Sequence, residues 1–398
     1  MYKRFLLVYL CLFCAWGSLF SQYDGSVAMK DGIYKGYRMK NNQPDSEMTQ
    51  VRQISLGNGV QVYMDADKQS YLSGTYYVFL GGSERIYGIA KFDKGLLHGE
   101  YLLYADNYLS RKMTYDRGLL EGKRYAYFED GEEQSVADYK KGIIQQTLVY
   151  HKTGQLKEKS FFDEFGLRHG SFILYDSKGE ITKESNYQHG QLHGKSMTRT
   201  REGFQEISHY NEGILQGEYQ LLFPNGQVKE EGHYNSQNER SGKWTTYNED
   251  GSLQHITHYE KGELEGASIT YYIGENMASY REYKKGKEDG KVQEYEENPH
   301  RLKLDATYKN GRLDGEYKAY NEGVIWRDCL YKEGNIISEK QYRNGQVVIL
   351  RMMDESGQLV DVRRFDTSGK AVYTNEKYRK HENVRLVEDD FGIIDVNY

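Results

Sequence analysis

Apolar and aromatic residues alternate with polar ones in short runs along most of the chain, and glycines separate these runs. One run holds Tyr219, Leu221 and Phe223 at every second position, as expected for a strand with one packed face. The next run spans residues 228–234. Between the two runs, Asn225-Gly226 predicts a type I′ hairpin turn, because such a turn needs positive φ at both central residues.

This pattern recurs at steps of 23 to 25 residues, and most copies open with Gly-x-Leu-x-Gly or a variant of it. The first glycine of each copy falls at Gly95, Gly118, Gly142, Gly166, Gly190, Gly213, Gly262, Gly286, Gly311 and Gly334, with an upstream copy at Gly74 and a degenerate copy ending at Gly242. A period of this length indicates a repeat array. The sequence therefore predicts an all-β fold: an elongated, twisted array of about twelve antiparallel β-hairpin repeats of about 24 residues each, with irregular N- and C-terminal caps.

The regularity of the pattern divides the chain into four segments. We assign residues 1–21 to a signal peptide and 22–73 to an N-terminal cap or degenerate repeats. Residues 74–345 form the hairpin array, and 346–398 hold degenerate repeats and a tail. Atypical end units are expected, since the terminal strands of such an array would otherwise expose unpaired edges.

Aromatic residues stand three apart in the first strand of many repeats, as in Trp244/Tyr247 and Tyr317/Tyr320. On a regular strand, residues three apart point to opposite faces. Either both faces of the sheet are aromatic, or a β-bulge brings each pair to one side. The second strand often ends in tyrosine, which predicts a ladder of packed rings along the array.

The N-terminus has the features of a secretory signal. Lys3 and Arg4 precede an almost wholly apolar stretch, 5–16, and small residues lead to a predicted cleavage site near Ser21-Gln22. We therefore expect an exported protein that is periplasmic, associated with the outer membrane or secreted. Cleavage leaves Cys329 as the single thiol, so an intrachain disulfide is excluded for the mature chain.

Net charge bears on the class of partner. Removing the two basic residues of the signal changes the formal charge from 53 − 59 = −6 to 51 − 59 = −8. A negative chain opposes nucleic-acid binding and offers no broad attraction to anionic lipid. No nucleic-acid partner is predicted.

The sequence Tyr-x-x-Gly-x-Leu-x-Gly-x-Tyr, followed by a second glycine turn, resembles the MORN repeat. Its best copies contain Phe92/Gly95/Leu97/Gly99/Tyr101, Tyr210/Gly213/Leu215/Gly217/Tyr219 and Tyr308/Gly311/Leu313/Gly315/Tyr317. The bacterial variant found in YwqK-like proteins, often labelled antitoxin components, is the most similar. The resemblance covers about two thirds of the chain. It implies antiparallel hairpins laid side by side and a role in binding or scaffolding, and it transfers no catalytic residue.

Histidines occupy two repeat positions, one with His98, His169 and His193 and another with His209, His233 and His258. Equivalent atoms of neighbouring hairpins lie roughly 10 Å apart, two strand spacings, whereas zinc binds nitrogen at about 2.0–2.1 Å. Equivalent histidines therefore cannot share an ion. The acidic stretches 65–67 and 248–251 lack the spacing of a calcium loop, and no catalytic motif is present. We predict no metal, no cofactor and no enzymatic activity.

The aromatic rows are the candidate binding residues. Trp244 and Trp326 come first, because tryptophan is over-represented at binding hot spots, and they are joined by Tyr219, Tyr247, Tyr317 and Tyr320. The favoured function is a non-enzymatic exported repeat scaffold that presents an extended β-sheet for protein–protein interaction at the cell envelope. The alternatives are a sheet that binds carbohydrate or lipid through its aromatic face, and a binding protein of the antitoxin or immunity type.

Overall fold

The computed structural model describes residues 34–40, 43–56, 60–80, 86–274, 276–354 and 356–374. All secondary-structure elements in these ranges are β-strands, and the strands form antiparallel hairpins. This confirms the predicted all-β hairpin fold. These ranges contain no helix long and apolar enough to cross a membrane. The predicted signal peptide (1–21) and the tail from residue 375 lie outside them. Two compact units are present, one ending at Ile181 and one beginning at Thr182.

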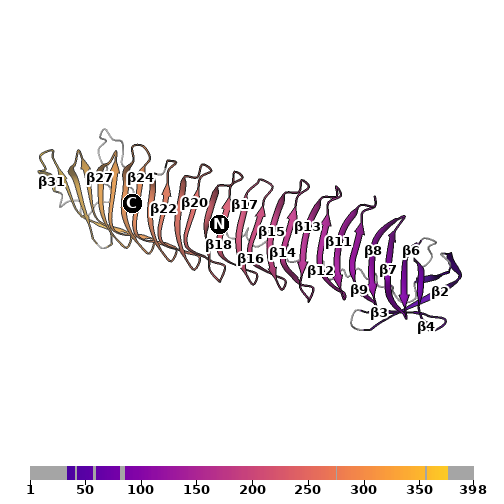
Figure 1. Cartoon of the computed structure of the whole chain (residues 1–398). Coiled ribbons are helices and arrows are strands. Elements are labelled where there is room, and N and C mark those ends of the chain that lie inside the picture. Colours follow the sequence, from indigo (N-terminus) through magenta and orange to yellow (C-terminus); the bar gives the residue numbers. More distant parts are fainter. Residues whose placement is uncertain are drawn as a thin grey trace. The chain divides into compact units, whose positions relative to one another are not determined.

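In the first unit, strands β5 to β14 pair largely in chain order, with β8 pairing to both β9 and β10 (Figure 1). Strand β1 pairs with β5 and with β2, and β2 continues to β3 and β4. The strands are β1 (Tyr34–Lys40), β2 (Gln43–Ser55), β3 (Gln61–Asp65), β4 (Ser70–Tyr71), β5 (Gly74–Leu80), β6 (Ile86–Asp93), β7 (Leu96–Ala105), β8 (Tyr108–Asp116), β9 (Leu119–Leu120), β10 (Gly122–Tyr127), β11 (Glu133–Lys140), β12 (Ile143–Tyr150), β13 (Leu156–Phe162) and β14 (Arg168–Tyr175).

The segment β2–β4 covers the first hairpins and forms an apolar core with them. The Tyr63 N–H donates to the Gly95 carbonyl oxygen at 2.7 Å, and the Gly95 N–H donates to the Leu72 carbonyl oxygen at 2.7 Å. Leu72 and Met113 are 1% and 0% exposed within a buried cluster drawn from β2, β3 and β5–β8. Burial of this kind is the main source of stability in a small domain.

The second unit is a succession of hairpins in which the strands from β15 to β31 pair in chain order (Figure 1). Its strands are β15 (Ile181–Gln188), β16 (Gln191–Arg199), β17 (Gln205–Asn211), β18 (Ile214–Leu222), β19 (Val228–Tyr234), β20 (Arg240–Tyr247), β21 (Leu253–Glu260), β22 (Glu263–Tyr271), β23 (Met277–Lys284), β24 (Lys287–Glu296), β25 (Arg301–Lys309), β26 (Arg312–Asn321), β27 (Val324–Lys332), β28 (Asn335–Arg343), β29 (Gln346–Met353), β30 (Leu359–Phe365) and β31 (Ala371–Thr374).

The first glycine of the repeat lies in a two-residue turn. In Glu212-Gly213 both residues have positive φ, 49° and 81°, as a type I′ turn requires. The Gly213 N–H also donates to the Leu192 carbonyl oxygen of the preceding repeat at 2.8 Å. The same bond from a turn glycine to the preceding repeat recurs at Gly286, Gly311 and Gly334. These turns therefore connect each hairpin to the one before it.

The turn at Asn225-Gly226 was predicted with the wrong geometry. Gly226 has φ of 87°, but Asn225 has no positive φ. The Gly226 N–H donates to the Phe223 carbonyl oxygen, and the Phe223 N–H donates to Gln227. This is a type I turn followed by a left-handed glycine bulge. Oδ1 of Asn225 accepts the Gln227 N–H at 2.9 Å, so asparagine stabilises the turn through its side chain.

The second glycine of the repeat lies in a β-bulge instead of a turn. On β17 and β18, Tyr210 pairs with Leu215 while Ser208 pairs with Tyr219, so residues 216–218 all oppose one residue, His209. Gly217 has φ of 106°, which suits a residue without a Cβ. Nδ1 of His209 lies 2.9 Å from the Glu218 carbonyl oxygen across the bulge.

A carboxylate beside this bulge caps the next turn. Oδ2 of Asp314 accepts the Glu333 N–H at 3.0 Å, and Oδ2 of Asp289 accepts the Asn310 N–H at 3.0 Å. Glu121 and Glu265 make equivalent bonds. In all four cases the donor residue has positive φ in the following turn. The polar residue before the second glycine therefore stabilises contact between successive repeats.

Candidate interaction surface

Both faces of the second unit carry aromatic rings, which settles the two alternatives left by the sequence. A register shift lies between Thr246 and Tyr247, but the additional residue, Gln254, is on the partner strand. Trp244 and Tyr247 therefore still alternate along their own strand and point to opposite faces, and the Tyr247 hydroxyl reaches Glu231, which pairs with Thr245. We name the Trp244 side the packed face. Its central row of paired residues is Trp244, Thr257, Ser268, Arg281, Val292, Ala306, Tyr317, Cys329, Glu339 and Arg351.

We name the Tyr247 side the open face. Its central row is Thr245, Ile256, Ile269, Tyr280, Gln293, Asp305, Lys318, Asp328 and Lys340. From β25 onward this row alternates acid and base, with Lys340 47% exposed at its end. Charged groups that reach solvent are available to a partner, whereas buried ones are already used by the fold.

Trp244 is a core residue of the packed face. It is 1% exposed, and its ring centroid lies 5.5 Å from that of Tyr219 and 5.1 Å from that of Tyr234. The Arg240 guanidinium lies over the indole at 3.9 Å, a favourable cation–π contact. Burial first, and then the charge of Glu206, raise the pKa of Tyr219. This geometry gives Trp244 and Tyr219 a packing role in the free protein.

Charged residues on the packed face are matched within the fold. Both terminal guanidinium nitrogens of Arg281 contact carboxylates, Nη1 that of Glu288 and Nη2 that of Glu294. Farther along, the carboxylate of Glu339 lies 2.8 Å from Nε of Arg327 and 2.6 Å from a terminal nitrogen of Arg351. Tyr317 completes this face, with its ring centroid 5.8 Å from that of Tyr331.

Burial and the two arginines act on Glu339 in opposite directions. Burial tends to raise the pKa of this carboxyl, but the charges of Arg351 and Arg327 outweigh it and hold the pKa below its usual range. The neighbouring thiol of Cys329 is 2% exposed, and burial raises its pKa to about 11. A protonated, covered thiol is a poor nucleophile.

The open face carries the other two tyrosines predicted to bind. The Tyr247 hydroxyl donates to Oε1 of Glu231 at 2.8 Å. Tyr320 lies two residues beyond Lys318 on the same strand, and therefore on the same face. Burial raises the pKa of both tyrosines, and nearby carboxylates add to the effect. Of these two tyrosines, Tyr320 lies on the part of the open face where acids and bases alternate.

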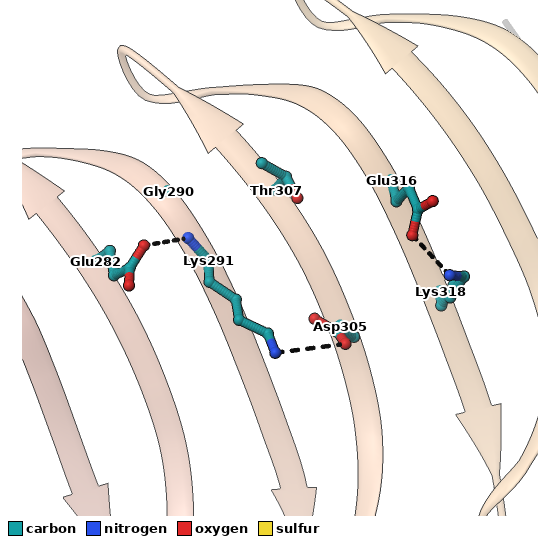
Figure 2. Close-up of a pocket in the computed structure, with 7 residues that line it drawn as sticks. All are labelled: Glu282, Gly290, Lys291, Asp305, Thr307, Glu316 and Lys318. Atoms are coloured by element: carbon teal, nitrogen blue, oxygen red, sulfur yellow. Dashed lines mark hydrogen bonds and ion pairs between the residues drawn. The ribbon is translucent and has the colours of Figure 1, made fainter.

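A hollow of about 430 Å³ lies on the open face where β23 to β26 run side by side (Figure 2). It is lined by Glu282, Gly290, Lys291, Asp305, Thr307, Glu316 and Lys318. Nζ of Lys291 reaches Oδ2 of Asp305 at 3.9 Å, and Nζ of Lys318 lies 2.6 Å from Oε2 of Glu316. Bonding to Glu316 raises the pKa of Lys318, and bonding to Lys318 lowers that of Glu316.

The bulge at Gly290 shapes the base of this hollow. A Cβ at residue 290 would clash with the Glu282 carboxylate, whose Oε2 accepts the Lys291 N–H at 2.8 Å. Oε1 of the same carboxylate accepts the Tyr280 hydroxyl at 2.7 Å. Glu282 therefore occupies the position over the bulge that His209 occupies in an earlier repeat, and both of its oxygens are engaged.

Exposed apolar side chains of the second unit concentrate on its last strands. Five of the seven that the structure describes lie on β27 to β30, the other two being Ile214 and Ile273. These five, with their exposed fractions, are Val324 (54%), Trp326 (36%), Leu330 (44%), Met352 (39%) and Val360 (42%). Trp326 occupies a bulge position, since Tyr320 pairs with Ile325 and Ala319 with Arg327. We call this set the apolar patch.

Several polar residues singled out in the sequence serve local structure. Oδ1 of Asp250 accepts the Ser252 N–H at 2.9 Å, and Oδ1 of Asp65 accepts the Asp67 N–H at 3.0 Å. Nδ1 of His258 lies 2.9 Å from the Ala267 carbonyl oxygen, as His209 does in its own repeat. The hollow was missed because its residues lie on four strands and are joined only by pairing register.

Comparison with known proteins gives little similarity. No family model and no curated protein matches the sequence. One matching solved structure is a porin-like protein from Bacteroides uniformis, with 7% identity and a TM-score of 0.14, covering 65% of this chain and 93% of that one. Another is a putative 6-phosphogluconolactonase from Bacteroides fragilis, with 12% identity and a TM-score of 0.11, covering 71% and 97%. Scores this low carry no argument about activity.

Proposed function

We propose that this chain is a non-enzymatic repeat scaffold, similar to MORN-repeat proteins of the YwqK-like type, whose sheet binds a protein partner at the cell envelope. The concentration of exposed apolar side chains in the apolar patch supports this proposal. Protein interfaces commonly combine an apolar centre with a polar rim. Here Asp328 lies on β27 with Leu330, and Lys340 lies on β28, the strand between β27 and the strand of Met352.

Trp326 is the residue on which we expect partner binding to depend most. Its side chain is 36% exposed, whereas Trp244 is covered by neighbouring rings and Arg240. An exposed tryptophan loses water contact only when a partner covers it, so its burial contributes to affinity. At Trp244 the ring is already buried in the free protein, so its burial stabilises the fold and is not available to a partner.

The experiment is crosslinking pull-down from envelope extract, followed by binding assays with the purified partner. A Trp326→Ser, Leu330→Ser variant should weaken binding by about tenfold or more, which is about 1.4 kcal/mol. Ile273→Ser is the matched control, because Ile273 is 78% exposed in the same unit but lies outside the apolar patch. Equal affinity of the two variants for the partner would contradict the proposal.

Export is a separate part of the proposal, supported by the basic and apolar segments within residues 1–21. Fractionation of cells that express the chain with and without this segment provides the test. We expect the full chain in the envelope or the medium, with loss of the N-terminal segment from the mature protein. Retention of both forms in the cytoplasm would exclude an envelope role.

A further inference from the structure

The hollow on β23 to β26 offers hydrogen-bonding groups that the fold itself leaves accessible. Glu282 is engaged by Tyr280 and by the Lys291 N–H. By contrast, the side chains of Lys291 and Glu316 are 50% and 70% exposed. Asp305 and Lys318 are 31% and 32% exposed, and Thr307 is also exposed. The hollow thus has a fixed base and a rim of donors and acceptors.

These groups nearly cancel one another in charge. Three carboxylates and two ammonium groups line the hollow, a formal sum of −3 + 2 = −1. Each ammonium lies within 4 Å of a carboxylate, Lys291 with Asp305 and Lys318 with Glu316. Such pairs produce a weak net field, so a strongly charged ligand gains little from them. They still donate and accept hydrogen bonds at adjacent points.

An aromatic residue, Tyr320, lies on the same face of β26 as the rim residue Lys318. Tyr320 follows Lys318 by two positions on β26, and Lys318 pairs directly with Asp305 on β25. Among the residues that the structure describes, Tyr320 makes no ring contact or hydrogen bond. Burial, and then the charge of Asp305, raise the pKa of Tyr320. A flat apolar surface therefore lies next to the polar groups.

We propose that this hollow binds a neutral glycan, with Asp305 and Glu316 accepting sugar hydroxyls, Lys291 and Lys318 donating to them, and Tyr320 contacting an apolar sugar face. The hydroxyls of a sugar both donate and accept, so they match a rim on which carboxylates and ammonium groups alternate. The proposal goes beyond the protein scaffold and does not depend on it, since the hollow lies on β23–β26 and the apolar patch on β27–β30.

The geometry favours a glycan over an extended peptide. Peptides that add to a sheet do so through unpaired backbone at its edge. Strands β24 and β25 are paired on both sides, so their backbone groups are already used. A ligand of the hollow must therefore be recognised by side chains alone. Hairpins repeat at roughly 10 Å, which suits a polymer that extends across neighbouring strands.

The test uses neutral hexasaccharides of glucose, of mannose and of N-acetylglucosamine, with titration of the full chain by NMR and calorimetry. We expect binding of at least one of them, in the millimolar range or tighter. Tyr320→Ala and Asp305→Asn should each weaken that binding about tenfold. Tyr247→Ala is the matched control, because Tyr247 lies on the same face, on β20, three strands from β23, the nearest strand of the hollow. Thermal melting identifies any variant that has not folded.

Three outcomes would overturn the proposal. The first is the absence of binding to all three hexasaccharides. The second is equal loss of affinity in Tyr320→Ala and Tyr247→Ala, which would indicate a general effect on the sheet. The third is that polyglutamate or an extended cationic peptide binds the hollow while the neutral sugars do not. None of these outcomes would contradict the proposal that the apolar patch binds a protein, because the Trp326 variant tests a different surface.

Discussion

The first and the last hairpins bury the centre of one sheet face with different kinds of side chain. In the first unit, β2–β4 cover the first hairpins, and an apolar cluster that includes Leu72 and Met113 is buried there. In the second unit, the equivalent buried row on β28 holds an acid, Glu339, between Arg327 and Arg351. Both arrangements exclude water from the centre of a face, but one does so with a second layer and the other with paired charges.

The difference teaches where binding surfaces can arise on a repeat sheet. A covering layer adds apolar burial but removes one face from contact with partners. Without such a layer, polar pairs can satisfy the packed face while the open face remains available. The hollow and the apolar patch both lie on strands of this second kind. We therefore expect the two regions to respond differently to mutation, pH and salt.

The largest effect is expected at Glu339. Glu339→Gln keeps the shape of the side chain but leaves Arg327 and Arg351 without their shared carboxylate, and breaking a buried ion pair costs about 3–5 kcal/mol. In a repeat protein the loss should be local, so faster amide exchange is expected on β27–β29. Exchange in β5–β8 should not change. Uniform acceleration in both units would contradict the local character of this cluster.

The same cluster predicts a pH dependence. Because the folded-state pKa of Glu339 lies below its usual value of 4.5, the ion cluster contributes stability above about pH 4.5. That contribution is lost as the pH falls through the lowered folded-state pKa. Protection from exchange on β27–β29, corrected for the pH dependence of the intrinsic exchange rate, should therefore fall in acid, and Glu339→Gln should remove this Glu339-dependent part of the change. An unchanged acid response in the variant would assign it to other carboxylates.

A second, smaller effect is expected in the apolar region. Leu72→Ala removes a side chain that is 1% exposed, and such changes cost about 2–5 kcal/mol. Amide exchange in β3 and β5–β7 should quicken, while 1 M salt should leave the effect unchanged because no charge is involved. Arg363→Ala, at an exposed ion pair in the second unit, is a control for a surface change. A strongly salt-dependent Leu72 effect would break the contrast between the regions.

The sequence predicts the hairpin period well but not the roles of its two glycines. Both glycines of Gly-x-Leu-x-Gly look like turn residues, yet Gly213 is in a turn and Gly217 is in a bulge. A positive φ explains glycine equally well at either place. The bulge is visible only when pairing register is known, because it depends on the partner strand.

The candidate site is predictable only in part, for a related reason. Aromatic spacing leaves open whether the rings lie on both faces or on one, and it cannot rank their exposure. The sequence places both Trp244 and Trp326 in strands and does not distinguish their exposure. Trp244 is buried because Gly232, on the neighbouring strand, leaves room for its ring. The hollow needs Glu282, Asp305 and Glu316 on one face, which no local sequence motif encodes. Whether the predicted residues bind a partner stays a prediction.

The smallest effect concerns the carboxylate that caps the next turn. In Asp314→Ala the Glu333 N–H loses its acceptor, and one such hydrogen bond contributes about 1 kcal/mol. A change of this size should raise the exchange rate of the Glu333 amide roughly fivefold. Glu260→Ala is a suitable control, since that exposed carboxylate caps no turn among the described residues. If the Glu333 amide exchanges at the same rate in both variants, the hydrogen bonds from the turn glycines hold successive repeats together without help from Asp314. The acid before the bulge would then be only a surface residue.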